Sequence, residues 1–128
     1  MKIVSLIARI ILGLEFLTFG LNGFFQFLHM PPPSGVAGQY LGALFVSHYY
    51  VAIFLLQAFG GALLLVNRFV PLALTLLGPV LANILLFHIS MNPEGLPMAL
   101  ITLLLWVIVL IPVRRAFVPL FAARTSAV

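Results

Sequence analysis

Four long apolar runs constrain the fold of this chain more than any other feature. They cover about residues 3–28, 49–66, 69–89 and 96–113, and each is near the ~20 residues that a helix needs to cross a ~30 Å hydrocarbon core. Only helices and closed barrels satisfy their backbone hydrogen bonds in lipid, and the alternating pattern of barrel strands is absent from the sequence. The sequence therefore predicts an all-α membrane protein, one domain built as a bundle of four transmembrane helices.

Composition excludes several classes of protein. Only 6% of the 128 residues are charged, whereas soluble domains carry about 25%. The chain has no cysteine, which excludes disulfides and thiolate metal sites. It has no nucleophile–base pair, phosphate-binding glycine loop or paired carboxylates, so we expect no enzymatic activity from the chain alone. No basic patch is interleaved with aromatic residues, so we expect no nucleic-acid partner.

The segment between the first two runs, residues 29–48, is the longest connection. It begins with a break rich in proline and glycine, and its apolar residues then recur on one helical face. This pattern predicts a short interfacial helix on the membrane surface, and an ordered loop packed on the bundle remains the alternative. The first run starts like a signal peptide, but Arg9 and Glu15 interrupt it, so we expect a retained helix.

The basic residues predict the orientation. None of them lies in the connection 29–48 or in the connection 90–95, so all fall on one side of the predicted bundle. The positive-inside rule assigns that side to the cytoplasm, with both termini and a tail at 114–128 there, and it places Tyr40, Tyr49 and Tyr50 at the outer interface. The basic residues are Lys2, Arg9, Arg68, Arg114, Arg115 and Arg124.

Polar residues form a stripe on the first predicted helix. Thr18, Asn22 and Gln26 follow Glu15 at +3, +7 and +11, which is one helical face. Such a face must contact protein or water rather than lipid tails. We therefore expect it to face the interior of the bundle.

Each of the other three helices adds a polar residue at a similar depth. Counted at ~1.5 Å per residue from the basic end, Glu15, Gln57, Asn83 and Thr102 lie roughly 16–21 Å deep, and Asn22, His88 and Tyr50 roughly 27–28 Å. These two sets are candidates for ligand binding or proton handling. Mutual hydrogen bonding between helices is the structural alternative.

The third and fourth helices add two further expectations. Pro79 cannot donate a backbone hydrogen bond, so a kink is expected that frees the carbonyl of Thr75. Trp106 lies one turn from Thr102, and its indole N–H could bond to Glu15 or to that carbonyl. A lipid-facing or space-filling role of Trp106 remains the alternative.

Small residues predict close helix packing. Gly13 and Gly20 share one face of the first helix, and Ala58, Gly61 and Ala62 form a ridge on the second. The ridge suits a contact within the chain or a contact between copies in a homo-oligomer.

Glu15 can be explained without a function. Arg9 lies six residues away, about 120° around the helix, so an ion pair is not expected. A neutral carboxyl bonded to Gln57 or Asn83 would suffice structurally, and a proton carrier or ligand anchor is the functional alternative.

The remaining titratable residues suggest no metal site. His29, His48 and His88 lie on the outer side, but their spacing matches no ligand motif. Glu94 belongs to an Asn-Pro-Glu-Gly sequence typical of a helix start, which accounts for its presence.

The segments "ARIILGLEFLTFGLNGFFQF" (8–27) and "GGALLLVNRFVPLALTLLGPVLANILLFHI" (60–89) resemble the DoxX-like family of small bacterial four-helix membrane proteins. The resemblance extends over about residues 8–118 and is carried by the Arg-x-x-x-Gly start of the first helix, the glycine ridge and the Arg-Phe-Val-Pro turn. It implies a place in the bacterial cytoplasmic (inner) membrane. The family takes its name from association with a thiosulfate:quinone oxidoreductase, and some members resemble membrane partners of redox enzymes. Many relatives carry an acid where this chain has Gln57.

Three hypotheses follow. The first is a non-catalytic accessory subunit of a redox complex that contacts quinone through Glu15, Asn83, Thr102 and Trp106, because a quinone site needs an apolar slot and one or two donors. The second is a proton-coupled small-molecule transporter that uses Glu15, as small multidrug exporters use a glutamate of their first helix. The third is a structural or assembly protein. The residues themselves indicate no cofactor, and the partners expected are lipid, redox-complex subunits or further copies of the chain.

Overall fold

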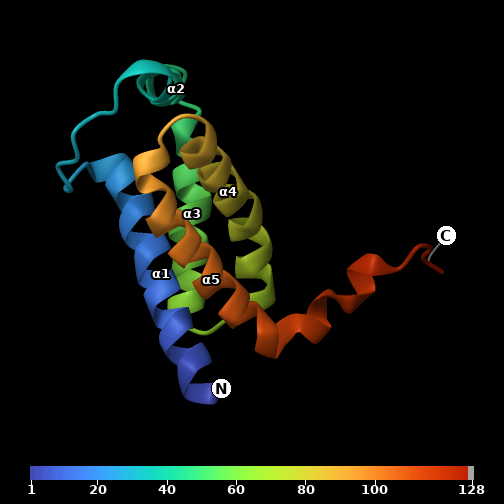
Figure 1. Ribbon diagram of the computed structural model, residues 1–128. Coiled ribbons are helices and arrows are strands. Elements are labelled where there is room, and N and C mark those ends of the chain that lie inside the picture. Colours follow the sequence, from blue (N-terminus) through green and yellow to red (C-terminus); the bar gives the residue numbers. More distant parts are fainter. Residues whose placement is uncertain (127–128) are drawn as a thin grey trace.

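The computed structural model describes residues 1–126, and this part of the chain is helical without a strand. Four helices lie side by side in a bundle, and a fifth crosses one of its ends (Figure 1). The bundle consists of α1 (Lys2–Phe25), α3 (Tyr50–Leu65), α4 (Val70–Ser90) and α5 (Leu96–Val113), and α2 (Gly35–Val46) crosses its end. Two 3₁₀ helices, η1 (Pro93–Gly95) and η2 (Arg114–Phe121), flank α5.

The all-α prediction is confirmed, and each predicted run corresponds to one helix of the bundle. The fourth run matches α5 in both bounds, whereas α1 ends before residue 28. Gln26 takes a left-handed conformation with φ 50° and ψ 44°, and its N–H donates to the carbonyl of Asn22, which ends the helix. The helix expected within residues 29–48 is α2. Residues 114–121 of the predicted tail form η2, and residues 127–128 lie outside the described part of the chain.

The helices differ in how well they suit a membrane. Three segments are long and apolar enough to cross one, namely α1, α4 and the continuous stretch Pro93–Phe121 that contains α5. With 16 residues, α3 is shorter, and it follows α2 after a bend of 89°. Residues 1–126 therefore contain three candidate spans, or four when α2 and α3 are taken together as one.

Glycines allow α1 and α3 to pack at close range. A Cβ atom placed on Gly20 would lie 2.5 Å from the backbone nitrogen of Ala58, and one placed on Gly61 would lie 2.7 Å from the carbonyl oxygen of Gly13. Side chains larger than hydrogen would separate the two backbones at these points. The small-residue ridge predicted on the second helix therefore packs against α1 of the same chain.

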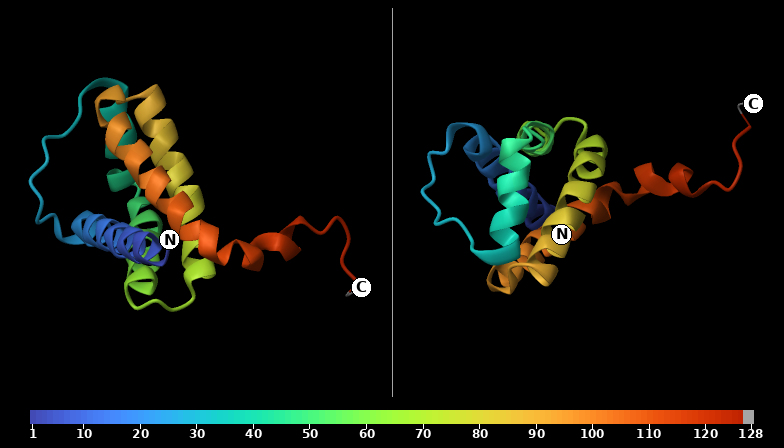
Figure 2. Two further views of the ribbon diagram at one scale, coloured as in Figure 1. Left: turned by 60° about the horizontal axis from the view of Figure 1, so that its bottom comes forward. Right: turned by 90° about the horizontal axis from the view of Figure 1, so that it is seen from above.

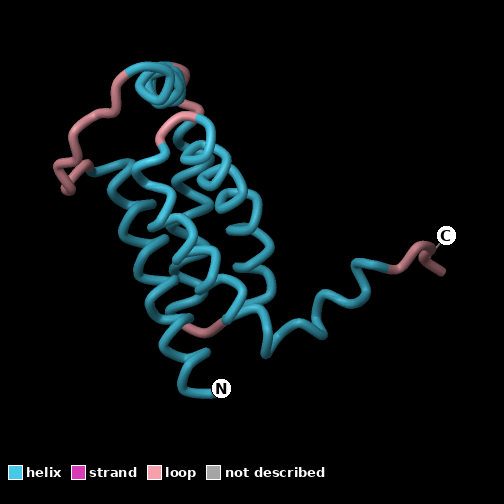
Figure 3. The backbone as a smooth tube through the Cα atoms, in the orientation of Figure 1, coloured by secondary structure: helices cyan, strands magenta, loops and turns pink. Residues whose placement is uncertain are grey.

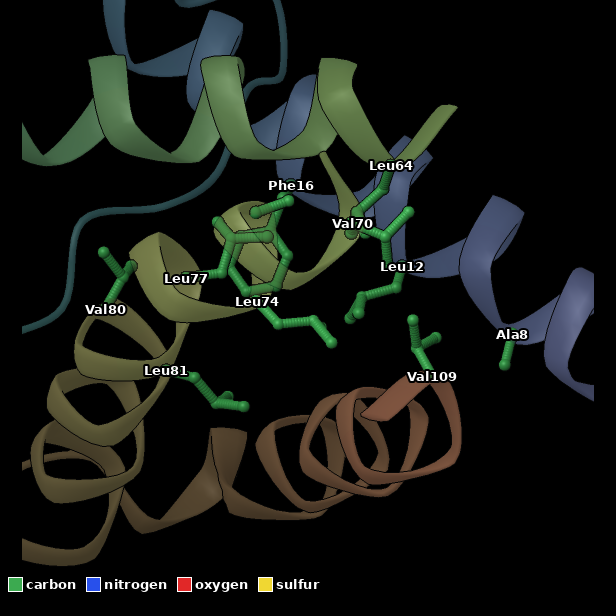
Figure 4. Close-up of a cluster of buried hydrophobic side chains, with 11 residues drawn as sticks. Ala8, Leu12, Phe16, Leu64, Val70, Leu74, Leu77, Val80, Leu81 and Val109 are labelled. Atoms are coloured by element: carbon green, nitrogen blue, oxygen red, sulfur yellow. The ribbon is translucent and has the colours of Figure 1, made fainter. Parts of the chain in front are cut away.

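The interior of the bundle is a continuous apolar core, in which side chains from α1, α3, α4 and α5 point toward one another (Figure 4). Leu12, Leu64, Leu74 and Leu77 are fully buried. Many outward-facing residues of the same helices are apolar too, as Leu104 of α5 illustrates with 59% exposure. Helices that are apolar all round are typical of proteins that lie in lipid.

The chain connections gather at the two ends of the bundle (Figure 3). The start of α1, the α3–α4 connection and the α5–η2 junction lie at one end, and α2 and the α4–α5 connection lie at the other (Figure 1). Residues 114–126 extend away from the bundle in all views (Figure 2). All six basic residues belong to the first end or to this tail. Near that end, the guanidinium of Arg9 donates to the carbonyl of Leu64 in the last turn of α3.

Candidate functional site

A cavity of about 250 Å³ lies between the four helices of the bundle. Each helix contributes one polar side chain to its wall, and most of the remaining wall is aromatic or aliphatic. Ligand sites in helical bundles have this composition, an apolar slot with a few convergent polar groups. The polar residues are Glu15 of α1, Gln57 of α3, His88 of α4 and Thr102 of α5, and the apolar residues are Phe16, Phe19, Phe54, Ile84, Met98 and Ala99.

Glu15 and Thr102 form the only side-chain hydrogen bond between α1 and α5 in residues 1–126. The hydroxyl of Thr102 is hydrogen-bonded to Oε1 of Glu15, and it also lies 3.1 Å from the carbonyl oxygen of Met98. A hydroxyl has a single proton and can donate to one acceptor at a time. Both contacts are satisfied together when the carboxyl carries a proton and donates it to the hydroxyl, which then donates to Met98. Thr102 is 4% exposed and Glu15 is half-buried, so the hydroxyl lies in the interior and the carboxyl at the cavity wall.

Glu15 has a different partner from the one expected. The structural alternative considered from the sequence was a bond to Gln57 or Asn83, whereas the hydrogen-bond partner in the structure is Thr102. Gln57 is 6% exposed and lines the same cavity, so its amide is available to a bound molecule. Among residues 1–126, the cavity wall contains no Lys or Arg that could form an ion pair with Glu15.

The α4–α5 connection positions His88. Its Nδ1 lies 3.0 Å from the carbonyl oxygen of Asn92, and the ring packs directly on Gly95, where a Cβ atom would lie 2.2 Å from Cε1. When Nδ1 donates to that carbonyl, Nε2 is the acceptor nitrogen. The imidazole is therefore held by its own turn while it lines the cavity. The sequence placed His88 in the outer set, away from Glu15, and the structure brings both into one wall.

Other candidates from the sequence lie outside the cavity. Asn83 is exposed, and its amide donates to the hydroxyl of Tyr40 over 2.8 Å, which ties α4 to α2. Asn22 accepts a bond from the N–H of Leu28 over 2.7 Å and so caps the end of α1. Thr18 is half-buried and does not line the cavity, and Tyr50 stacks on a phenylalanine of α2 with ring centroids 4.7 Å apart.

Trp106 anchors α5 to α4. Its indole N–H donates to the carbonyl of Leu74 over 3.2 Å, so its acceptor is neither Glu15 nor the Thr75 carbonyl, the two acceptors considered from the sequence. Leu74 is fully buried, whereas Thr75, the next residue, is exposed and its hydroxyl donates to the carbonyl of Pro71. One residue corresponds to about 100° of rotation around a helix, which accounts for the difference. Pro79, where a kink was expected, lies inside α4, and the helix continues through it from Val70 to Ser90.

The aromatic part of the cavity wall was not predicted from the sequence. Phe19 follows Glu15 at +4 and so shares its helical face, a signal that was present in the sequence. Phe54 comes from α3, and its position beside α1 depends on the packing of the two helices.

No three His, Cys, Asp or Glu side chains of residues 1–126 gather as a metal site would require. Comparisons with protein-family models, with curated proteins and with solved structures found no match to this chain. The cavity and the basic residues at one end of the bundle are therefore the basis for inferring a function.

Proposed function

We propose that this chain is a DoxX-like integral membrane protein that serves as an accessory subunit of a redox complex and holds the ring of a quinone in the Glu15 cavity. One observation carries the proposal. A single cavity combines a polar residue from each of the four bundle helices with aromatic walls. The resemblance of residues 8–27 and 60–89 to that family supports the link to quinone-dependent enzymes.

The cavity suits the head of a quinone rather than a whole lipid. Its volume of about 250 Å³ is below the ~300–1,000 Å³ of sites for drug-sized ligands, so it would take one substituted ring and leave an isoprenoid tail in the bilayer. Phe16, Phe19 and Phe54 offer ring faces and edges against which a planar ring can pack.

The polar residues suit the oxygens of such a ring. Both quinone oxygens are acceptors, and the amide of Gln57 is a donor that forms no hydrogen bond with another side chain of residues 1–126. A quinone supplies redox chemistry when bound. Glu15 and Thr102 would hold a proton beside the ring, and Glu15 is the only acid in the cavity wall within residues 1–126.

We further propose that four segments cross the bacterial cytoplasmic membrane, with α2 at the outer surface and both termini inside. The basic residues support this orientation, because they cluster at one end of the bundle and in the adjoining tail.

Single-cysteine labelling tests the orientation, and the absence of native cysteine makes it direct. We expect Ser34→Cys, before α2, to react with a membrane-impermeant maleimide in intact spheroplasts. Ser126→Cys, in the tail, should react only after lysis. Both residues are exposed, so accessibility within the protein does not limit labelling. Reversed labelling would contradict the proposed topology.

Quinone binding can be measured through Trp106, the single tryptophan, because quinones quench indole fluorescence. In nanodiscs titrated with a short-tailed benzoquinone, we expect saturable quenching. Gln57→Leu and Thr102→Val should each raise the Kd about two- to tenfold, the value of one hydrogen bond. Thr75→Val is the matched control, because Thr75 bonds only to its own helix and lies outside the cavity. Its Kd should equal that of the wild type.

Equal effects of Thr75→Val and Thr102→Val would contradict the quinone site. The transporter hypothesis keeps one supporting observation, since an ionised Glu15 with aromatic neighbours would suit a lipophilic cation. Uptake of tetraphenylphosphonium into proteoliposomes, driven by a proton gradient and lost in Glu15→Gln, would favour transport. Failure of both ligands would favour a structural role.

A further inference from the structure

We propose that a second cavity, at the basic end of the bundle, binds the headgroup of an anionic phospholipid. The cavity has a volume of about 290 Å³ and lies between the start of α1, the α3–α4 connection and the end of α5. It shares no wall residue with the Glu15 cavity. The inference therefore depends on the protein lying in a membrane and not on quinone binding.

The polar part of the wall is made of hydrogen-bond donors suited to a phosphate. Lys2, Ser5 and Arg9 follow one another at +3 and +4 on α1, which places them on one helical face. Asn67, from the turn after α3, also lines the cavity. Among residues 1–126, the wall contains no Asp or Glu that would repel an anion or neutralise the two cations.

Arg9 is held in place for this role. Its Nη1 donates to the carbonyl of Leu64, which fixes the guanidinium at the end of α3. A guanidinium has five N–H donors in a planar fork, so the other four remain for a phosphate oxygen pair. Because the hydrogen-bond partner of Arg9 is a neutral carbonyl, the positive charge of the guanidinium is not neutralised by that bond and can attract an anion.

The remaining wall favours a lipid over a free phosphate ion. Val109 and Pro112 of α5 and Val70 of α4 form an apolar surface beside the donors. A basic pocket between membrane helices, at the depth of the headgroups on the positively charged side, is the setting in which anionic lipids bind. The cavity would hold the phosphate and glycerol, with the acyl chains lying against the apolar helices.

Native mass spectrometry of the full chain in a neutral detergent tests this site. We expect the wild type to retain phosphatidylglycerol in preference to phosphatidylcholine. Lys2→Gln should lower the apparent affinity for phosphatidylglycerol about fivefold, the effect of one basic side chain at an anionic surface. Arg9→Gln should lower it at least as much.

Arg115→Gln is the matched control, because it removes one charge from the same end of the protein at an exposed position outside the cavity. It should leave the affinity unchanged. Since Arg9 also bonds to Leu64, its variant could fail to fold, and Lys2→Gln then decides the result. Equal retention of both lipids, or equal losses in Lys2→Gln and Arg115→Gln, would overturn the proposal. Displacement of phosphatidylglycerol by millimolar inorganic phosphate would show that the free ion is the ligand and would overturn the lipid assignment.

Discussion

Replacing Gly20 by alanine is expected to destabilise the protein by about 1–3 kcal/mol, the usual effect of overpacking. The new Cβ atom would lie 2.5 Å from the nitrogen and 2.9 Å from the Cα of Ala58, so two backbones must separate. Alanine favours a helix by about 1 kcal/mol over glycine, and the loss is expected in spite of that gain. The measurement is the free energy of unfolding in a titration with sodium dodecyl sulfate, followed by circular dichroism.

Gly78→Ala provides the control for this prediction. Gly78 also lies within a bundle helix, but a Cβ atom there would meet only Cζ2 of Trp106, at an ordinary distance of 3.6 Å. We expect this variant to be as stable as the wild type or up to about 1 kcal/mol more stable, from helix propensity alone. If both variants shifted the free energy of unfolding in the same direction, the close contact between α1 and α3 would not be the cause of the loss in Gly20→Ala.

Replacing Leu77 by alanine is expected to cost more, about 2–5 kcal/mol in the free energy of unfolding. Leu77 is fully buried and fills the space over Gly60, where a Cβ atom would lie 2.7 Å from its Cγ. Lipid tails cannot enter this space, so the lost contacts are not replaced. The same titration measures the effect.

Leu86→Ala removes the same atoms from the same helix at a residue that is 62% exposed. Its effect should stay within about 0.5 kcal/mol. A loss equal to that of Leu77→Ala would mean that the apolar core does not decide the stability of the bundle.

The helices could be predicted from the sequence because a segment in lipid must satisfy its own backbone hydrogen bonds, which favours long apolar helices. Apolar runs of about 20 residues between breaks gave α3, α4 and α5 to within a residue at each end. The end of α1 was missed because it depends on the left-handed conformation of Gln26. The bend of 89° between α2 and α3 has no signal in hydropathy.

The candidate site could be predicted only in part, because counting along helices gives depth but not rotation. Ile84 and His88 are four residues apart and face the cavity together, whereas Asn83 is turned by about 100° from Ile84 and reaches α2. The bond between Glu15 and Thr102 joins residues 87 positions apart. It depends on which helices are neighbours, and that follows from packing.

The shortness of α3 has a consequence for the surrounding bilayer. At ~1.5 Å per residue, the 24 residues of α1 and the 21 of α4 span about 36 and 32 Å, whereas the 16 of α3 span about 24 Å. If α3 crosses the membrane as proposed, the hydrophobic surface of the molecule is shorter beside α3 than the ~30 Å of an average hydrocarbon core. Either the bilayer then becomes thinner beside α3 or the whole bundle tilts, and the free-energy cost is a fraction of a kcal/mol for each Å of mismatch. When the bilayer adjusts rather than the bundle, the deformation falls beside α3, and a second membrane protein with an equally short helix next to it would relieve that deformation.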